Sequence, residues 1–237
     1  MTIKMMYNIT TLRGTMFYTP IRYTKEFVVN LGGIVEGYIP AFVRDPNALP
    51  MYQLWQLESP EQKELLAFNG DKIDLLKQVE GELDDAAIVA FTERCKEVFG
   101  KIMDVTDNNP CTRVALAPTV VVANNGARPD ALYARLFSAR EFKNTPLDAS
   151  NLSQVYRVVK SIGGKDVKLN HFANFHVDSQ IINVGAINNV RERYLCDFDI
   201  NTMADPNYKF DKAGMNEFFS MSASCFADFY KYYFSEE

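Results

Sequence analysis

Long apolar runs are missing from this sequence. The opening segment MTIKMMYNITTL contains no extended hydrophobic stretch of the kind that secretory signal peptides carry, and no later run approaches the length of a membrane span. A secreted or membrane-anchored protein is therefore not expected. We predict a protein that works in the cytoplasm and has no membrane partner.

Cysteine is scarce and widely spaced. Cys95, Cys111, Cys196 and Cys225 include no Cys-x-x-Cys pair of the kind that binds metals or exchanges electrons. A chain of 237 residues can bury enough apolar surface to fold without disulfide crosslinks. Four buried free thiols in a reducing compartment are the expected arrangement, and two disulfides are the alternative.

Glycine-rich phosphate loops and nucleophile signatures are also missing. The pairs Gly32-Gly33 and Gly163-Gly164 belong neither to a Walker loop nor to a Gly-x-Gly-x-x-Gly turn. The sequence has no Gly-x-Ser-x-Gly elbow and no cysteine-based catalytic signature. We therefore expect no cofactor, and no recognised motif supports a catalytic function.

The composition is that of a folded protein with an uneven charge. Hydrophobic residues make up 47% of the chain and aromatic residues 13%, which argues against disorder. The formal net charge of −5 does not suggest a general binder of nucleic acid. Residues 1–110 carry 11 basic and 16 acidic side chains, whereas residues 111–237 carry 14 of each. This asymmetry favours protein contacts over nucleic acid, although it does not exclude the latter.

Hydrophobic periodicity and turn residues outline the elements of each half of the chain. The elements expected in the first half are a strand at 10–18, a helix after Pro20, a loop or irregular edge segment at 36–50, a strand at 51–58, a hairpin at 63–79 that turns at Asn69-Gly70, and a helix from Asp84 or Asp85 to Met103. Those expected in the second half are a strand at 112–123 with Pro118 at an edge or bulge, a helix from Pro129 to Phe137, a hairpin at 154–179 that turns at Gly163-Gly164, a strand at 191–201, and a helix capped by Asp211.

Both halves thus have the order strand, helix, three-stranded meander, helix. This order predicts the α+β class, with helices on one face of an antiparallel sheet. We assign residues 1–110 to the first half and 111–237 to the second, packed as one globular unit, and leave open whether the halves are pseudo-repeats. The element order resembles the saddle of TATA-box-binding proteins, but the DNA-wedging motifs of that family are absent and the acidic charge does not suit DNA.

Two segments carry a resemblance to a known group of proteins. LWQLESPEQKELLAFNGDKIDLL at 54–76 and CDFDINT at 196–202, followed by a phenylalanine-rich last helix, resemble a group of uncharacterised bacterial proteins of similar length. The resemblance implies a bacterial protein. It brings no established activity, so no catalytic residue is carried over.

Three oxygen-bearing side chains alternate near the end of the chain. Asp197, Asp199 and Asn201 occupy every second position, so a strand would point all three to the same face. Such a face could bind a hard cation such as Mg²⁺ or Ca²⁺. It could equally be a solvated strand face whose charge is offset by a neighbouring cation, with Lys168 as a plausible source. We favour the structural alternative and predict no metal site.

The two histidines differ in their expected surroundings. In a strand, His171 shares a side with apolar residues and is expected in the core, whereas His176 shares a side with Asp178. A base oriented by a carboxylate is conceivable for His176 and Asp178, but no nucleophile can be assigned to them. A polar strand face explains both residues without catalysis.

Basic and aromatic residues of the second half could gather on one surface. These residues are Arg157, Lys160, Lys168, Arg191, Arg193, Tyr156 and Tyr194. Together they could form a nucleotide-binding or nucleic-acid-binding surface, and a solvated strand face is the alternative.

These observations lead to one functional hypothesis and two alternatives. We expect a non-catalytic bacterial cytoplasmic interaction or adaptor protein that acts with a protein partner or by self-association. One alternative is a metal-dependent phosphodiester or phosphate enzyme that uses Asp197 and Asp199. The other is a nucleotide-binding or nucleic-acid-binding module that uses the basic residues between 157 and 193.

Overall fold

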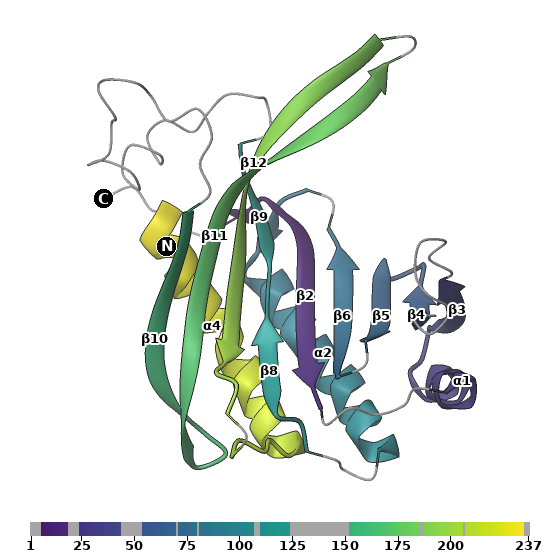
Figure 1. The fold of residues 1–237 in the computed structure, drawn as a ribbon. Helices are drawn as coiled ribbons and strands as arrows, with labels where there is room; N and C mark the ends of the chain where they lie inside the picture. The colour runs from purple at the N-terminus through teal and green to yellow at the C-terminus, as the bar shows by residue number, and fades with distance from the viewer. Residues whose placement is uncertain are drawn as a thin grey trace.

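The protein is built on one large antiparallel sheet. The computed structural model describes residues 6–18, 24–43, 54–69, 71–79, 81–106, 110–123, 152–184, 187–205 and 207–234. Within these ranges, ten strands form the main sheet and three helices accompany it, as Figure 1 shows. The predicted α+β class is therefore confirmed.

The strands of the main sheet follow one another in an order that differs from their order in the chain. Across the sheet they are β10 (Leu152–Ile162), β11 (Lys165–Val184), β12 (Ile187–Thr202), β8 (Arg113–Leu116), β2 (Ile9–Phe17), β6 (Lys72–Gln78), β5 (Glu64–Asn69), β4 (Leu54–Ser59) and β3 (Ile39–Val43). Strand β9 (Thr119–Ala123) continues the course of β8 and also lies between β12 and β2. Two short strands, β1 (Met6–Tyr7) and β7 (Leu83–Asp84), pair separately.

The first strand of each half lies at the centre of the sheet. β2 and β8 pair with each other, from Gly14 opposite Leu116 to Phe17 opposite Arg113. The last strand of each meander, β6 or β12, flanks this central pair on the outside. The helix expected from Pro129 to Phe137 falls outside the described residues, so the pseudo-repeat stays a prediction.

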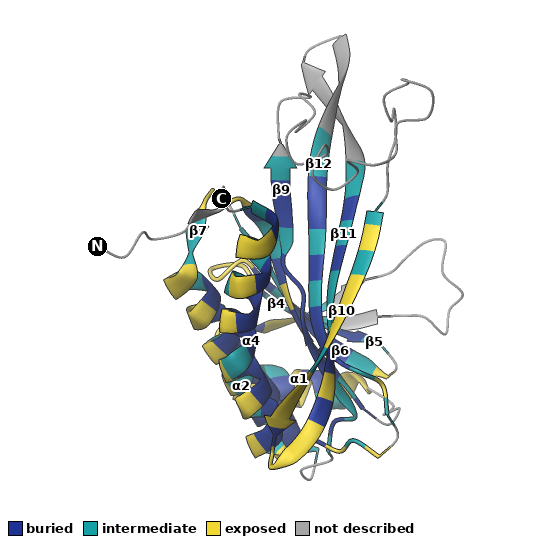
Figure 2. Cartoon of the chain, turned by 90° about the vertical axis from the view of Figure 1, so that its left-hand side faces the viewer, coloured by how far each residue is buried: buried dark blue, intermediate teal, exposed yellow. Residues whose placement is uncertain are grey.

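The two long helices pack side by side on one face of the sheet (Figure 2). They are α2 (Asp85–Val105) and α4 (Lys212–Phe234), while α1 (Lys25–Ile34) packs against β3 and β4. The predicted caps are present, because the side chain of Asp84 accepts a hydrogen bond from the Ala87 N–H and that of Asp211 accepts one from the Gly214 N–H. These bonds satisfy N–H groups that a helix start leaves without partners.

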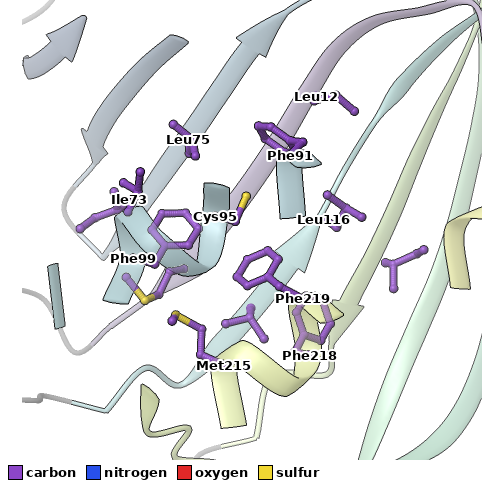
Figure 3. Packing of buried hydrophobic residues seen from close by; sticks show 14 of the residues in the cluster. Leu12, Ile73, Leu75, Phe91, Cys95, Phe99, Leu116, Met215, Phe218 and Phe219 are labelled. Atoms are coloured by element: carbon purple, nitrogen blue, oxygen red, sulfur yellow. The ribbon is translucent and has the colours of Figure 1, made fainter. Parts of the chain in front are cut away.

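The core lies between these helices and the sheet, and it is shared by both halves of the chain. Apolar side chains of α2 and α4 meet between the helices, where the rings of Phe99 and Phe219 lie 5.6 Å apart (Figure 3). Leu12 and Leu75 from the first half, together with Leu116 from the second, belong to the same buried cluster. The halves therefore share one hydrophobic core.

Two proline-containing segments, one predicted as a strand and one as a loop or irregular edge, differ from their predictions. Pro118 divides the segment 112–123 into β8 and β9, and it lies within the sheet, where its carbonyl accepts a hydrogen bond from the Phe198 N–H. Proline has no N–H to donate, so the ladder is interrupted there rather than at an edge. The proline-rich segment 36–50 contains a regular strand, β3, which pairs only with β4 within the described residues, so Pro40 is tolerated at this edge.

Strands β11 and β12 are both longer than the strands predicted at 165–179 and 191–201. The two strands stay paired from Leu169 opposite Thr202 to Val184 opposite Ile187, and they project beyond the other strands (Figure 1). The strand expected at 191–201 thus begins four residues earlier.

All four cysteines are buried and unbridged, which confirms the expected free thiols. Burial raises the pKa of the Cys111 thiol to about 12, so this thiol stays protonated and unreactive at neutral pH. Among the described helices, none combines the length and the hydropathy that a bilayer span requires.

Candidate binding groove on the uncovered sheet face

The acidic residues of β12 lie on the face of the sheet opposite α2 and α4. Phe198, between Asp197 and Asp199, points toward the helices and packs against Phe226 of α4. Because side chains alternate along a strand, Asp197, Asp199 and Asn201 point to the other face. On the neighbouring strand β11, the residues directly opposite these three are Asn174, Phe172 and Asn170.

A hydroxyl, an imidazole and an amide contact two of the three side chains. The Thr119 hydroxyl donates a hydrogen bond of 2.7 Å to Oδ1 of Asp197, and Nδ1 of His176 lies 3.5 Å from Oδ2 of the same carboxylate. The Asn170 amide donates a bond of 3.1 Å to Oδ1 of Asn201. Lys168, expected to offset the acidic face, lies instead opposite Val159 near the far end of β11. The expected counter-charge is therefore replaced by a hydroxyl and an imidazole.

Asp199 is the exception, because its Oδ1 atom is buried and has no hydrogen-bond partner in the part of the chain that the structure describes. A groove of about 310 Å³ opens beside it on the uncovered face. Arg13 of β2 lines the same groove, and Ala117 lies between the two, with its backbone paired to that of Arg13. An aspartate and an arginine thus stand on opposite walls of one polar groove. The residues that line it are Thr11, Arg13, Leu76, Ala117, Thr119, Phe172, Asn174, Asp197, Phe198 and Asp199.

The arrangement around His176 does not form a nucleophile and base. Among the described residues, the Asp197 carboxylate and the Asn174 carbonyl lie near its Nδ1, and the Thr119 hydroxyl donates to Asp197 rather than to the imidazole. Asp178 lies on β11 opposite Arg193, and its side chain is outside the described part of the structure. In the described ranges, no three His, Cys, Asp or Glu side chains are placed to hold a metal ion.

His171 lies on the helix-covered face, as its apolar neighbours predicted. Its ring centroid is 5.4 Å from that of Phe229 in α4. Burial lowers the pKa of this imidazole, and the positive charge of Lys160 lowers it further. His171 is thus a neutral part of the packing between β11 and α4.

The basic and aromatic residues of the second half divide between the two faces. Tyr156 packs its ring against Phe229 and Tyr232 on the helix-covered side, and Lys160 shares this side of β10. Arg157 lies on the uncovered side, where its Nε donates to the Asn170 side chain. Of the others, Lys168 follows the alternation to the uncovered side, Arg193 and Tyr194 lie opposite Asp178 and Val177, and Arg191 lies opposite Gln180 with its side chain outside the described residues. The structure does not bring them together on one surface.

A different surface stands out at the edge of the sheet. Within the described residues, β10 pairs only with β11, so one of its sides carries no strand. Large apolar side chains remain exposed on both faces of this strand: Val155 (48%) and Val159 (58%) on the uncovered face, and Tyr156 (40%) on the helix-covered face, where Tyr232 (63%) of α4 lies beside it. We call these four residues and the unpaired side of β10 the β10 edge.

Sequence reasoning identified the acidic side of the groove but missed its other members. Arg13 and Thr119 lie on β2 and β9, far from Asp197 in the chain, and no local motif connects them. The β10 edge was likewise missed, because a hairpin pattern does not show which of its strands ends the sheet.

Comparisons with protein-family models, with curated proteins and with solved structures found no match. Function is therefore inferred from the geometry of this chain alone.

Proposed function

We propose that the protein is a non-catalytic interaction protein of the bacterial cytoplasm that binds a protein partner along the β10 edge. The observation that carries this proposal is the exposure of Val155, Tyr156, Val159 and Tyr232 on or beside β10, a strand that pairs on one side only within the described residues. Natural proteins usually blunt or cover such edges, because the unpaired N–H and C=O groups readily accept another strand. An extended segment of a partner would complete the ladder and cover the apolar side chains.

The charge of the edge indicates the chemistry of that partner. From Leu152 to Lys168 the chain carries four basic residues, Arg157, Lys160, Lys165 and Lys168, and a single acidic one, Asp166. A second copy of the same strand would bring like charges together, which disfavours pairing. An extended segment that alternates acidic and apolar residues complements the edge in both charge and hydrophobicity.

A further observation suits the proposed compartment. Four buried free thiols suit a reducing compartment, in which disulfides do not persist.

The test is to change the β10 edge without disturbing the fold. Val155→Asp/Val159→Asp removes two exposed apolar contacts and repels an acidic partner, whereas Val89→Asp makes the same change at a position of α2 with similar exposure (47%). A protein bound from the producing cells by the wild type and by Val89→Asp, but not by the double variant, should then bind when both components are purified. We expect the double variant to lower the affinity at least about tenfold, which corresponds to roughly 1.4 kcal/mol.

Two results would contradict the proposal. One is a partner whose affinity is the same for the wild type and for Val155→Asp/Val159→Asp. The other is a partner that binds to a site lost only when residues outside the β10 edge are changed. Circular dichroism of each variant confirms that the fold is retained.

A further inference from the structure

We infer that the groove between β12 and β2 binds a small zwitterion, whose cationic group contacts Asp199 and whose carboxylate contacts Arg13. Both residues line the same groove on the uncovered face. Neither belongs to the β10 edge, so this inference does not depend on the proposed protein partner.

Asp199 is the residue that would contact the cationic group of the ligand. Among the described residues its buried Oδ1 atom accepts no hydrogen bond, so part of the carboxylate is desolvated without a partner. Such an arrangement costs free energy unless a donor or a cation completes it. Asp197, two positions away, adds a second negative charge, and its nearest described partners are the neutral Thr119 hydroxyl and the His176 imidazole. A ligand that brings a guanidinium or ammonium group would compensate this side of the groove.

Arg13 is the residue that would contact the carboxylate of the ligand. Its side chain is exposed, and no ion pair joins it to a carboxylate among the described residues. Strand β8 and the adjoining Ala117 separate β2 from β12, so Arg13 and Asp199 stand about two strand spacings apart, roughly 10 Å between backbones. The structure shows no ion pair between the two described side chains, so a ligand whose opposite charges are several ångströms apart can lie between them.

The floor and ends of the groove fit the same class of ligand. The small side chain of Ala117 lies between the two charged residues, and Phe172 and Leu76 provide apolar surface toward the two ends. A volume of about 310 Å³ accommodates a basic amino acid, with its aliphatic stem over Ala117. The groove is less suited to a metal ion, because Oδ1 of Asp197 already accepts a hydrogen bond from Thr119. A phosphate would be repelled by the two carboxylates.

The test uses L-arginine as the probe and agmatine as its matched analogue, which retains the guanidinium but lacks the carboxylate. Calorimetry on the full chain should show saturable binding of L-arginine and at least about tenfold weaker binding of agmatine. Asp199→Asn should abolish both, whereas Arg13→Gln should reduce the affinity for L-arginine to that for agmatine and leave agmatine unchanged. Asp166→Asn, at the turn between β10 and β11, is the control and should change neither.

A thermal melt provides a second readout that a merely structural role for Asp199 would not give. Because Asp199→Asn removes a half-buried carboxylate whose Oδ1 accepts no hydrogen bond from the described residues, the unliganded variant should melt at a midpoint about 2–4 °C higher than the wild type. A lower midpoint would show that Asp199 is paired in the folded protein and would overturn the inference. So would the absence of saturable L-arginine binding up to about 10 mM, or binding that Asp199→Asn leaves intact.

Discussion

Gly14 lies in β2 directly beneath α2. A Cβ atom built at this position would stand 2.5 Å from Sγ of Cys95, a distance that real Cβ atoms do not tolerate. Cys95 is itself fully buried in the core between α2 and the sheet (Figure 3). The missing side chain therefore sets how closely α2 approaches the sheet.

Gly14→Ala should lower the free energy of unfolding by about 1–3 kcal/mol, because the added methyl group overpacks this contact. Gly33→Ala is the matched control, since a Cβ atom there meets nothing within 4 Å and alanine suits the interior of α1. We expect the control to stabilise the protein by about 0.5–1 kcal/mol. Urea denaturation of both variants measures the difference.

The double variant Gly14→Ala/Cys95→Ala separates overpacking from other causes. Removing the sulfur should make room for the new methyl group, so the two changes should cost less together than the sum of their separate effects. Strictly additive losses would mean that the alanine at position 14 is destabilising for a reason other than its contact with Cys95.

At the same scale, the groove shows what a local pattern can predict about a site. The alternation of Asp197, Asp199 and Asn201 was sufficient to place them on one strand face, because the period of a strand is a local property. The positions of Arg13 and Thr119 depend on which strands become neighbours, and the long-range pairing of β2, β9 and β12 decides this. The local sequence pattern therefore could not predict that Arg13 and Thr119 lie in the same groove as Asp199.

Among the elements, α4 is the helix whose amphipathic stripe has the densest aromatic contacts. Phe198 of β12 packs against Phe226, Phe229 and Tyr233, with ring centroids 5.2 to 5.9 Å apart. Edge-to-face pairs of this kind contribute beyond the area that they bury. The stripe was predicted from spacing alone, since helical periodicity and the Asp211 cap are both local signals.

Phe226→Ala should reduce the free energy of unfolding by about 3–5 kcal/mol, because the side chain is fully buried against β12. Val89→Ala, on the exposed side of α2, should change it by no more than about 0.5 kcal/mol. Chemical denaturation of the two variants under identical conditions provides the comparison. A loss below about 1 kcal/mol for Phe226→Ala would place α4 away from the sheet in solution.

The elements that the sequence predicted well depend on interactions between residues close in the chain, whereas those it missed depend on contacts between distant segments. The hairpins and the ends of α2 and α4 follow from turns, caps and stripes within a few residues. The split of β8 from β9 depends on where Pro118 meets β12, and the regular strand β3 depends on its edge position beside β4. The length of the β11–β12 hairpin depends on pairing across strands rather than on either strand alone.

For the whole molecule, the pairing of β2 with β8 joins the two halves of the chain into one sheet. β2 is hydrogen-bonded to β6 from the first half and to β8 from the second, and α2 packs against α4 across the same boundary. Each half alone would expose an edge of the sheet and the apolar side of a long helix. We therefore expect the two halves to unfold as one cooperative unit.

Phe226→Ala also tests this cooperativity, because the change lies in the second half and the probe can lie in the first. Trp55, the only tryptophan of the chain, is in β4, four strands away from β8 in the order of the sheet. Its fluorescence should report the same unfolding transition as far-ultraviolet circular dichroism, which follows the whole chain. Because β4 is connected to α4 only through the shared sheet and core, Phe226→Ala should move both transitions to lower denaturant by the same amount. If the Trp55 transition stayed in place while the dichroism transition separated into two steps, the halves would be independent domains, and the continuous sheet would not be the unit that folds.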